Sequence, residues 1–235
     1  FRFFSFFFGS FFLFFSIAEG IDRRKNNPEY QHLFALGEEC NTAKITWHDY
    51  GLVYAKYLSH LQNKPIKFLE IGILHGDSVK MWEKYFPKGD LHFVDKTFER
   101  ITYFSKRSAY YLADQKIPEE LRKVIKETGS GFDVIMDDAG HHSEGQITSF
   151  IELFPHLKSG GLYIIEDLHT SYWKRYGGHG NHENPVAGSG SIIEFLQNLI
   201  HDVNFVGANT GRSNFPLLPE NYKASLSYYQ KHIYS

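Results

Sequence analysis

Between residues 67 and 165 the sequence alternates short apolar segments with segments whose apolar residues recur at helical spacing. This alternation constrains the fold more than any other feature. Strands that alternate with helices form a parallel sheet with helices on both faces, joined by right-handed crossovers. We therefore expect an α/β fold built on a doubly wound, mostly parallel sheet. The five predicted strands are Lys67–Ile71, Leu91–Val94, Ala109–Leu112, Phe132–Met136 and Leu162–Ile165.

Helical spacing of apolar residues predicts the segments that flank and connect these strands. Beyond the last strand, Ser171–Ser191 is rich in glycine and is expected to form a mobile lid. The predicted helices are Tyr50–Leu61, Val79–Phe86, Glu99–Ser108, Pro118–Glu127, Gly145–Leu157 and Ile192–Val203.

The chain has 235 residues, enough for one ordinary α/β domain, which we place at residues 46–203. Residues 21–45 are polar and mixed and are expected to form a linker. Residues 204–235 contain no convincing pair of strands and are assigned to a C-terminal segment.

Residues 1–20 form a phenylalanine-rich leader, which we exclude from the fold. Its apolar run of about 15 residues is short for a membrane-spanning helix, which needs about 20, and it fits the core of a signal peptide. A short membrane anchor and a non-native leader translated from upstream sequence are the alternatives. Contact with a membrane is therefore expected only if this segment is an anchor.

Composition excludes several classes of function. The formal net charge is -2, and the basic residues are scattered, so nothing indicates a nucleic-acid partner. The single cysteine, Cys40, excludes an internal disulfide and a cysteine-based zinc site.

Acidic residues follow the predicted strands, at the positions where each strand ends. In open parallel sheets, ligands bind beyond the carboxyl ends of the strands, where the strand order reverses. We therefore expect the functional site at this edge of the sheet, among Glu70, Asp95, Asp114, Asp138, Glu166 and Asp167.

A glycine turn follows the first predicted strand, with Gly72 and Gly76 in the pattern E-x-G-x-x-x-G-x-S. Glycines let the backbone approach a ligand closely, and the helix that starts at Ser78 presents free N–H groups. Leu74 stands where a dinucleotide-binding turn needs its second glycine, so a cofactor without phosphates fits better. Asp95, at the end of the second strand, is suited to accept hydrogen bonds from ribose hydroxyls.

Three carboxylates, those of Asp138, Glu166 and Asp167, end the fourth and fifth predicted strands. Adjacent strands lie about 4.8 Å apart, so these groups can converge on one ion. An oxygen-only ligand set suits Mg²⁺. His141 follows Asp138 by three residues and is a candidate general base, because a neutral imidazole can take a proton near pH 7.

The glycine turn, together with a following strand that ends in Asp95, resembles the cofactor motif of class I methyltransferases. The resemblance implies S-adenosylmethionine, with Glu70 and Ser78 in the motif. Gly72 and Gly76 would lie along its amino-acid portion, Asp95 at its ribose, and Asp114 and Gln115 near its adenine.

A narrower resemblance is carried by the segments 46–50, 137–141 and 164–173, which read T-W-H-D-Y, D-D-A-G-H and I-I-E-D-L-H-T-S-Y-W. They are similar to the metal-dependent sugar O-methyltransferases of macrolide biosynthesis, of the mycinamicin and macrocin type. That resemblance implies Asp138, Glu166 and Asp167 as Mg²⁺ ligands and His141 as the catalytic base. The expected acceptor is a hydroxyl of a sugar or other small molecule.

Proteins of this fold usually add two antiparallel strands at the sheet edge, and the chain ends about where these should begin. We expect the final edge strands to be lacking, with an oligomer or a partner covering the open edge. Two other functions remain open: a catechol-type O-methyltransferase and a non-catalytic binding or assembly module. The compartment is open as well, since the cofactor favours the cytoplasm and the leader favours secretion or an anchor.

Overall fold

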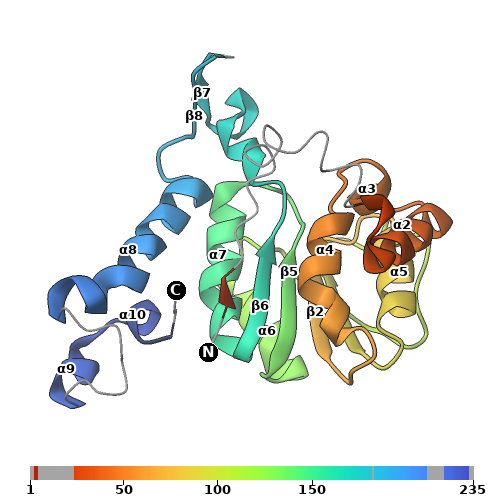
Figure 1. The fold of residues 1–235 in the computed structure, drawn as a ribbon, viewed down its shortest axis with the longest axis horizontal. Helices are drawn as coiled ribbons and strands as arrows, with labels where there is room; N and C mark the ends of the chain where they lie inside the picture. The colour runs from red at the N-terminus through yellow and green to blue at the C-terminus, as the bar shows by residue number, and fades with distance from the viewer. Residues whose placement is uncertain (1–2, 5–23, 182, 211–219, 233–235) are drawn as a thin grey trace.

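A computed structural model describes residues 3–4, 24–181, 183–210 and 220–232 (Figure 1). Its centre is a parallel sheet in the order β1-β6-β5-β2-β3-β4. All five predicted strands are present, and the doubly wound parallel sheet is confirmed. The strands are β1 (Phe3–Phe4), β2 (Lys67–Ile71), β3 (Asp90–Asp95), β4 (Ala109–Leu112), β5 (Phe132–Asp137) and β6 (Leu157–Ile165).

The strand order reverses between β2 and β5. From β2 the chain adds β3 and β4 on one side, then returns to place β5 on the other side of β2, followed by β6. Ile71 at the end of β2 pairs in register with Asp137 at the end of β5. The loops that follow these two strands therefore leave the sheet side by side, at the switch point where ligands of such sheets bind.

Helices cover both faces of the sheet (Figure 1). Successive side chains of a strand point to opposite faces, so Phe68 joins one buried cluster and Leu69 the other. The first cluster includes α2 (Pro28–Cys40), α4 (Gly51–Leu58) and α5 (Asp77–Tyr85). The second includes α6 (Pro118–Thr128), α7 (Ser143–Leu153) and α8 (Ile192–Thr210).

The range expected to be a linker, 21–45, contains most of α2 and α3 (Ala43–Thr46). Asn27 caps α2 by accepting hydrogen bonds from the backbone N–H groups of Glu29 and Tyr30, and Pro28 occupies the first turn. Leu33 of α2 is fully buried in the first cluster. The polar composition of this range hid a helix because only one narrow face of it meets the core.

The predicted helix at Glu99–Ser108 is wrong, because the structure has no helix there. The segment is held in an irregular path by hydrogen bonds to α5. Tyr103 and Ser105 both donate to the carboxylate of Glu83, and Arg107 donates to the backbone carbonyls of Gly89 and Phe86. Helical apolar spacing in a short segment was outweighed here by these tertiary contacts.

The edge of β6 that was expected to be open carries β1 over two residues, Phe3 and Phe4, paired with Leu162 and Tyr163. The other residues of the 1–20 leader lie outside the described part of the chain, as does much of the junction to the C-terminal segment. Within the described residues, no antiparallel strand joins the sheet. No described helix is both long and apolar enough to cross a lipid bilayer.

The segment expected to form a lid contains 3₁₀ turns and a two-stranded hairpin, β7 (His179–Gly180) with β8 (Pro185–Val186). The described C-terminal elements after α8 are α9 (Glu220–Ser225) and α10 (Tyr228–His232). Tyr229 of α10 packs against Phe150 and Phe154 on the α7 side of the sheet.

Replacing Leu33 by alanine tests whether α2 belongs to the core. We expect the free energy of unfolding to fall by roughly 2–5 kcal/mol, the usual cost of a buried Leu→Ala cavity, as measured by urea denaturation. Ile151→Ala is the matched control, because Ile151 lies on α7 and is 44% exposed. Equal small effects for both variants would contradict the packing of α2.

Candidate functional site

The glycine turn lies against the loop that follows β5. Gly72 has φ +87°, a conformation that favours glycine, and a Cβ added there would overlap the backbone carbonyl oxygen of Asp138. Gly76, with φ +88°, is the N-cap of α5, and a Cβ on it would lie 2.6 Å from the carbonyl oxygen of Tyr103. Both glycines are therefore required by close backbone approach. Leu74, between them, is 56% exposed at the turn's outer surface.

Asp95 closes the glycine turn from the neighbouring strand. Its Oδ2 atom accepts hydrogen bonds from the backbone N–H groups of Ile73 (3.0 Å) and Leu74 (3.3 Å). Its Oδ1 atom accepts one from Thr97 N–H at 3.2 Å. The residue expected to hold a ribose thus also fixes the shape of the turn, which sequence reasoning did not anticipate.

Glu70 and Ser78 form a buried pair beneath the turn. Ser78 Oγ donates to Glu70 Oε2 at 3.0 Å, and the two residues are 7% and 0% exposed respectively. Burial raises the pKa of the Glu70 carboxyl, and the neighbouring Lys44 opposes that rise. Both residues support the turn from inside rather than line its surface.

Gln115 connects β4's end to the β5–α7 loop. Its amide donates to the carboxylate of Asp137 and accepts a hydrogen bond from Gly140 N–H at 2.8 Å. Asp137 is fully buried, which raises its pKa, and it also accepts a hydrogen bond from Ser149. Asp114 accepts from Lys116 N–H and stays at the surface of its own turn. Gln115 thus orders the loop that carries Asp138 and His141.

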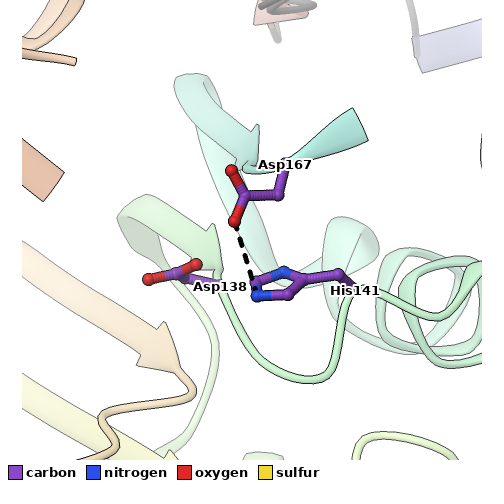
Figure 2. Close-up of side chains that lie close together, drawn as sticks. All are labelled: Asp138, His141 and Asp167. Carbon is purple, nitrogen blue, oxygen red and sulfur yellow. Dashed lines mark ion pairs between the residues drawn. The ribbon is translucent and has the colours of Figure 1, made fainter. Parts of the chain in front are cut away.

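Asp138, His141 and Asp167 converge at the carboxyl ends of β5 and β6 (Figure 2). One ligand atom from each lies within 4.8 Å of the others, and His141 Nε2 is 3.4 Å from Asp167 Oδ2. His141 and Asp167 both have φ +54°, a left-handed conformation that non-glycine residues rarely adopt. Such strain often accompanies functional sites. In this case both strained residues aim their side chains into one cluster.

Asp167 is surrounded by further polar groups. The Tyr50 hydroxyl donates to its Oδ1 atom, and the Nδ1 atoms of His48 and His169 lie 3.8 and 3.9 Å from that atom. Burial lowers the pKa of His169, and Asp167 opposes that change. Asp167 is therefore the carboxylate on which the α4 entry segment and the β6–lid segment meet.

Glu166 points to a different part of the cluster from Asp167. It is 4% exposed, and it accepts a hydrogen bond from the Tyr54 hydroxyl at 2.5 Å. Lys44 Nζ lies 3.0 Å from each of its carboxylate oxygens. Burial and the nearby Asp138 carboxylate raise the pKa of Glu166 well above its usual range, and Lys44 and Tyr54 oppose that rise.

Lys44 is the central cation of the site. Its ammonium also binds Asp138 and lies 3.2 Å from Glu70 Oε1, while its side chain is 5% exposed. Burial on its own would lower the pKa of Lys44. The carboxylates of Asp138, Glu166 and Glu70 outweigh that effect and hold its pKa well above the ordinary value. Lys44 therefore stays protonated.

Sequence reasoning missed Lys44, Tyr50 and Tyr54. The two tyrosines stand four residues apart, which places them on one face of the α4 region, and this spacing was the available signal. For Lys44 the sequence carries no such signal, because its partners lie 26 to 122 positions away. The structure brings together Asp138, His141 and Asp167, and it sets Glu166 apart from them beside Lys44 and Tyr54.

Comparison with characterised proteins gives relatives of one kind. No protein-family model matches the chain. It is 37% identical over 176 residues to the L-olivosyl-oleandolide 3-O-methyltransferase of Streptomyces antibioticus, which covers 72% of this chain and 44% of that protein. It is 32% identical over 154 residues to the mycinamicin VI 2''-O-methyltransferase of Micromonospora griseorubida, covering 63% of this chain and 37% of that protein.

Among solved structures, the chain is similar to MycE, a methyltransferase of mycinamycin biosynthesis solved with Mg and S-adenosylhomocysteine. The TM-score is 0.69 at 28% identity, with 84% of this chain and 49% of that chain covered. A second MycE complex, which also holds mycinamycin VI, gives 0.66 at 29% identity and covers 76% and 49%.

This chain is a relative of the macrolide sugar O-methyltransferases. It shares their Rossmann-like class I methyltransferase fold, so the resemblance inferred from the sequence motifs and the fold that it implied are both confirmed. The chain spans less than half the length of these two curated macrolide relatives. Their substrates therefore bear on this chain only as a basis for a proposal.

Replacing Gly72 by alanine tests the close approach of the two loops. A Cβ there meets the Asp138 backbone and a positive φ together, whereas at Gly190 (φ +69°) it meets no atom within 4 Å. We expect Gly190→Ala to cost about 1–2 kcal/mol of unfolding free energy from backbone strain alone, and Gly72→Ala to cost distinctly more. Equal losses in urea denaturation would show that the loops do not depend on this contact.

Proposed function

We propose that this chain carries the methyltransferase domain of an S-adenosylmethionine-dependent, Mg²⁺-assisted O-methyltransferase that acts on a hydroxyl of a sugar or similar small molecule. One observation carries the proposal: the cluster of Asp138, His141 and Asp167 lies directly beside the glycine turn, because Gly72 packs on Asp138. A methyl donor in the turn would thus lie next to a group that can take the acceptor's proton. The names of the relatives support the same chemistry.

The glycine turn fits a cofactor of this kind. The first turn of α5 has no side-chain cap, so its N–H groups are available to a carboxylate. Gly72 and Gly76 would lie along the amino-acid portion of the cofactor, and Asp95 at the ribose. Asp114 and Gln115 would lie near the adenine. When bound, the cofactor supplies an electrophilic sulfonium methyl group.

The acidic cluster fits a divalent cation. Asp138 and Asp167 offer hard oxygen ligands, and the separation of their ligand atoms from that of His141 suits one shared ion. Glu166 is retained as a ligand of the proposed site, although it is held by Lys44 and Tyr54 in this structure. When bound, the metal makes an acceptor hydroxyl more acidic.

His141 is suited to accept the acceptor's proton. Its Nε2 atom faces the cluster at 3.4 Å from Asp167, so that carboxylate can stabilise the positive charge that the ring gains. The ring is partly buried, which keeps bulk water from competing for the proton. Methyl transfer neutralises the sulfonium charge and is favoured in such a dry site.

A cytoplasmic location is part of this proposal because the methyl donor is an intracellular metabolite. An oligomer or partner at the β6 edge, and a membrane contact of the leader, stay predictions.

The test is methyl transfer from S-adenosylmethionine to a panel of deoxysugar-bearing polyketides, with and without EDTA. We expect transfer to a sugar hydroxyl that EDTA abolishes and Mg²⁺ restores. Transfer to catechol but not to sugars would favour the catechol-type enzyme. Cofactor binding with no transfer to any acceptor would favour a non-catalytic binding module.

Two substitutions separate the roles within the cluster. His141→Ala should slow transfer by about 10²–10⁴-fold, the usual contribution of a general base, and leave the affinity for S-adenosylhomocysteine nearly unchanged. Asp138→Asn, which preserves shape but removes charge, should abolish the response of the rate to Mg²⁺. Calorimetric titration with S-adenosylhomocysteine provides the control for folding. An unchanged rate for His141→Ala would remove it from the mechanism.

A further inference from the structure

Two cation positions lie side by side at the carboxyl ends of β2, β5 and β6. The outer position is enclosed by Asp138, His141 and Asp167. The inner position is enclosed by the carboxylates of Glu70, Asp138 and Glu166, and the ammonium of Lys44 occupies it. Asp138 borders both positions. The proposed metal would take the outer one, so the inner one needs a separate account.

The inner position has the ligand set of a metal site. Lys44 Nζ lies 3.0 Å from both oxygens of Glu166 and 3.2 Å from Glu70 Oε1, and it also contacts Asp138 Oδ2. Four carboxylate oxygens from three strands thus surround one positive charge. Carboxylates arranged in this way suit a hard cation, and a lysine ammonium with its three donors is the side-chain equivalent.

Burial makes this cation indispensable to the local structure. Glu70 and Glu166 are 0% and 4% exposed, and isolated buried carboxylates are strongly unfavourable unless they are paired. Within the described part of the chain, Lys44 is the cation that pairs with both of them. Glu70 Oε1 accepts no hydrogen bond from any described residue, so its negative charge depends on the nearby ammonium.

We propose that Lys44 is a built-in cation that fills the inner position, so that the site takes a single divalent ion at the outer one. Lys44 is then a positioning residue: it holds Asp138 and Glu166 in place and ties them to Glu70, which supports the glycine turn through Ser78. This inference rests on the metal part of the proposed function.

The test is the number of Mn²⁺ ions bound per chain, with Mn²⁺ used as a spectroscopically visible hard cation. Binding of the metal alone is measured by electron paramagnetic resonance for the wild type, Lys44→Ala and Lys44→Arg. We expect Lys44→Ala to bind one ion more than the wild type, because the vacated position retains its carboxylates. Lys44→Arg keeps the charge and should bind as many ions as the wild type.

A thermal measurement accompanies the titration. Lys44→Ala should melt at a lower temperature than the wild type without metal, and Mn²⁺ should raise its melting temperature by more than it raises that of the wild type. Lys84→Ala is the matched control, because Lys84 pairs with Glu39 at the surface, and it should respond to Mn²⁺ as the wild type does. If Lys44→Ala does not fold, the same ion count is made on Lys44→Ala/Glu70→Gln against Glu70→Gln alone.

The outcomes distinguish this inference from the proposed function. A variant without Lys44 that gains no ion and shows no larger thermal response to Mn²⁺ overturns the role of Lys44, whatever the wild type binds. A wild type that binds no Mn²⁺ overturns the metal part of the proposed function. In that case a gain of one ion in Lys44→Ala would still support Lys44 as the resident cation.

Discussion

The site depends on bringing several carboxylates together at one end of a parallel sheet and keeping them there. Glu70, Asp138 and Glu166 end β2, the β5 loop and β6, and their mutual repulsion in a buried setting opposes folding. The Lys44 ammonium, supplied by α3 from outside the sheet, lies among all three. The α2–α3 segment is therefore as much a part of the site as the strand ends are.

The same arrangement explains how the cofactor turn and the reacting groups come to be neighbours. The strand order reverses between β2 and β5, so the two loops leave the sheet together, and Gly72 allows them to touch. Asp95 and Gln115, from the next strands, then hold one loop each through hydrogen bonds to backbone N–H groups. Side chains that the family resemblance assigns to the cofactor thus also hold the empty site in shape.

Some of the site could be read from the sequence because it follows from strand ends. Asp138, His141 and Asp167 come directly after apolar strands, and parallel strands must end at one edge, so their convergence was predictable. Glu166 was grouped with them for the same reason. Neighbouring residues of an extended chain point to opposite sides, however, and Glu166 turns inward to Lys44 and Tyr54 while Asp167 turns toward His141.

The sequence by itself determined the parallel sheet, its strands and the position of the glycine turn, because these follow from local periodicity and from the special conformations of glycine. Tertiary structure alone decided the rest. Glu99–Ser108 is not helical because Tyr103, Ser105 and Arg107 bind α5 and the loop after it. Lys44 became the central cation because burial forces distant charges to pair, and no local pattern encodes a partner that lies up to 122 positions away.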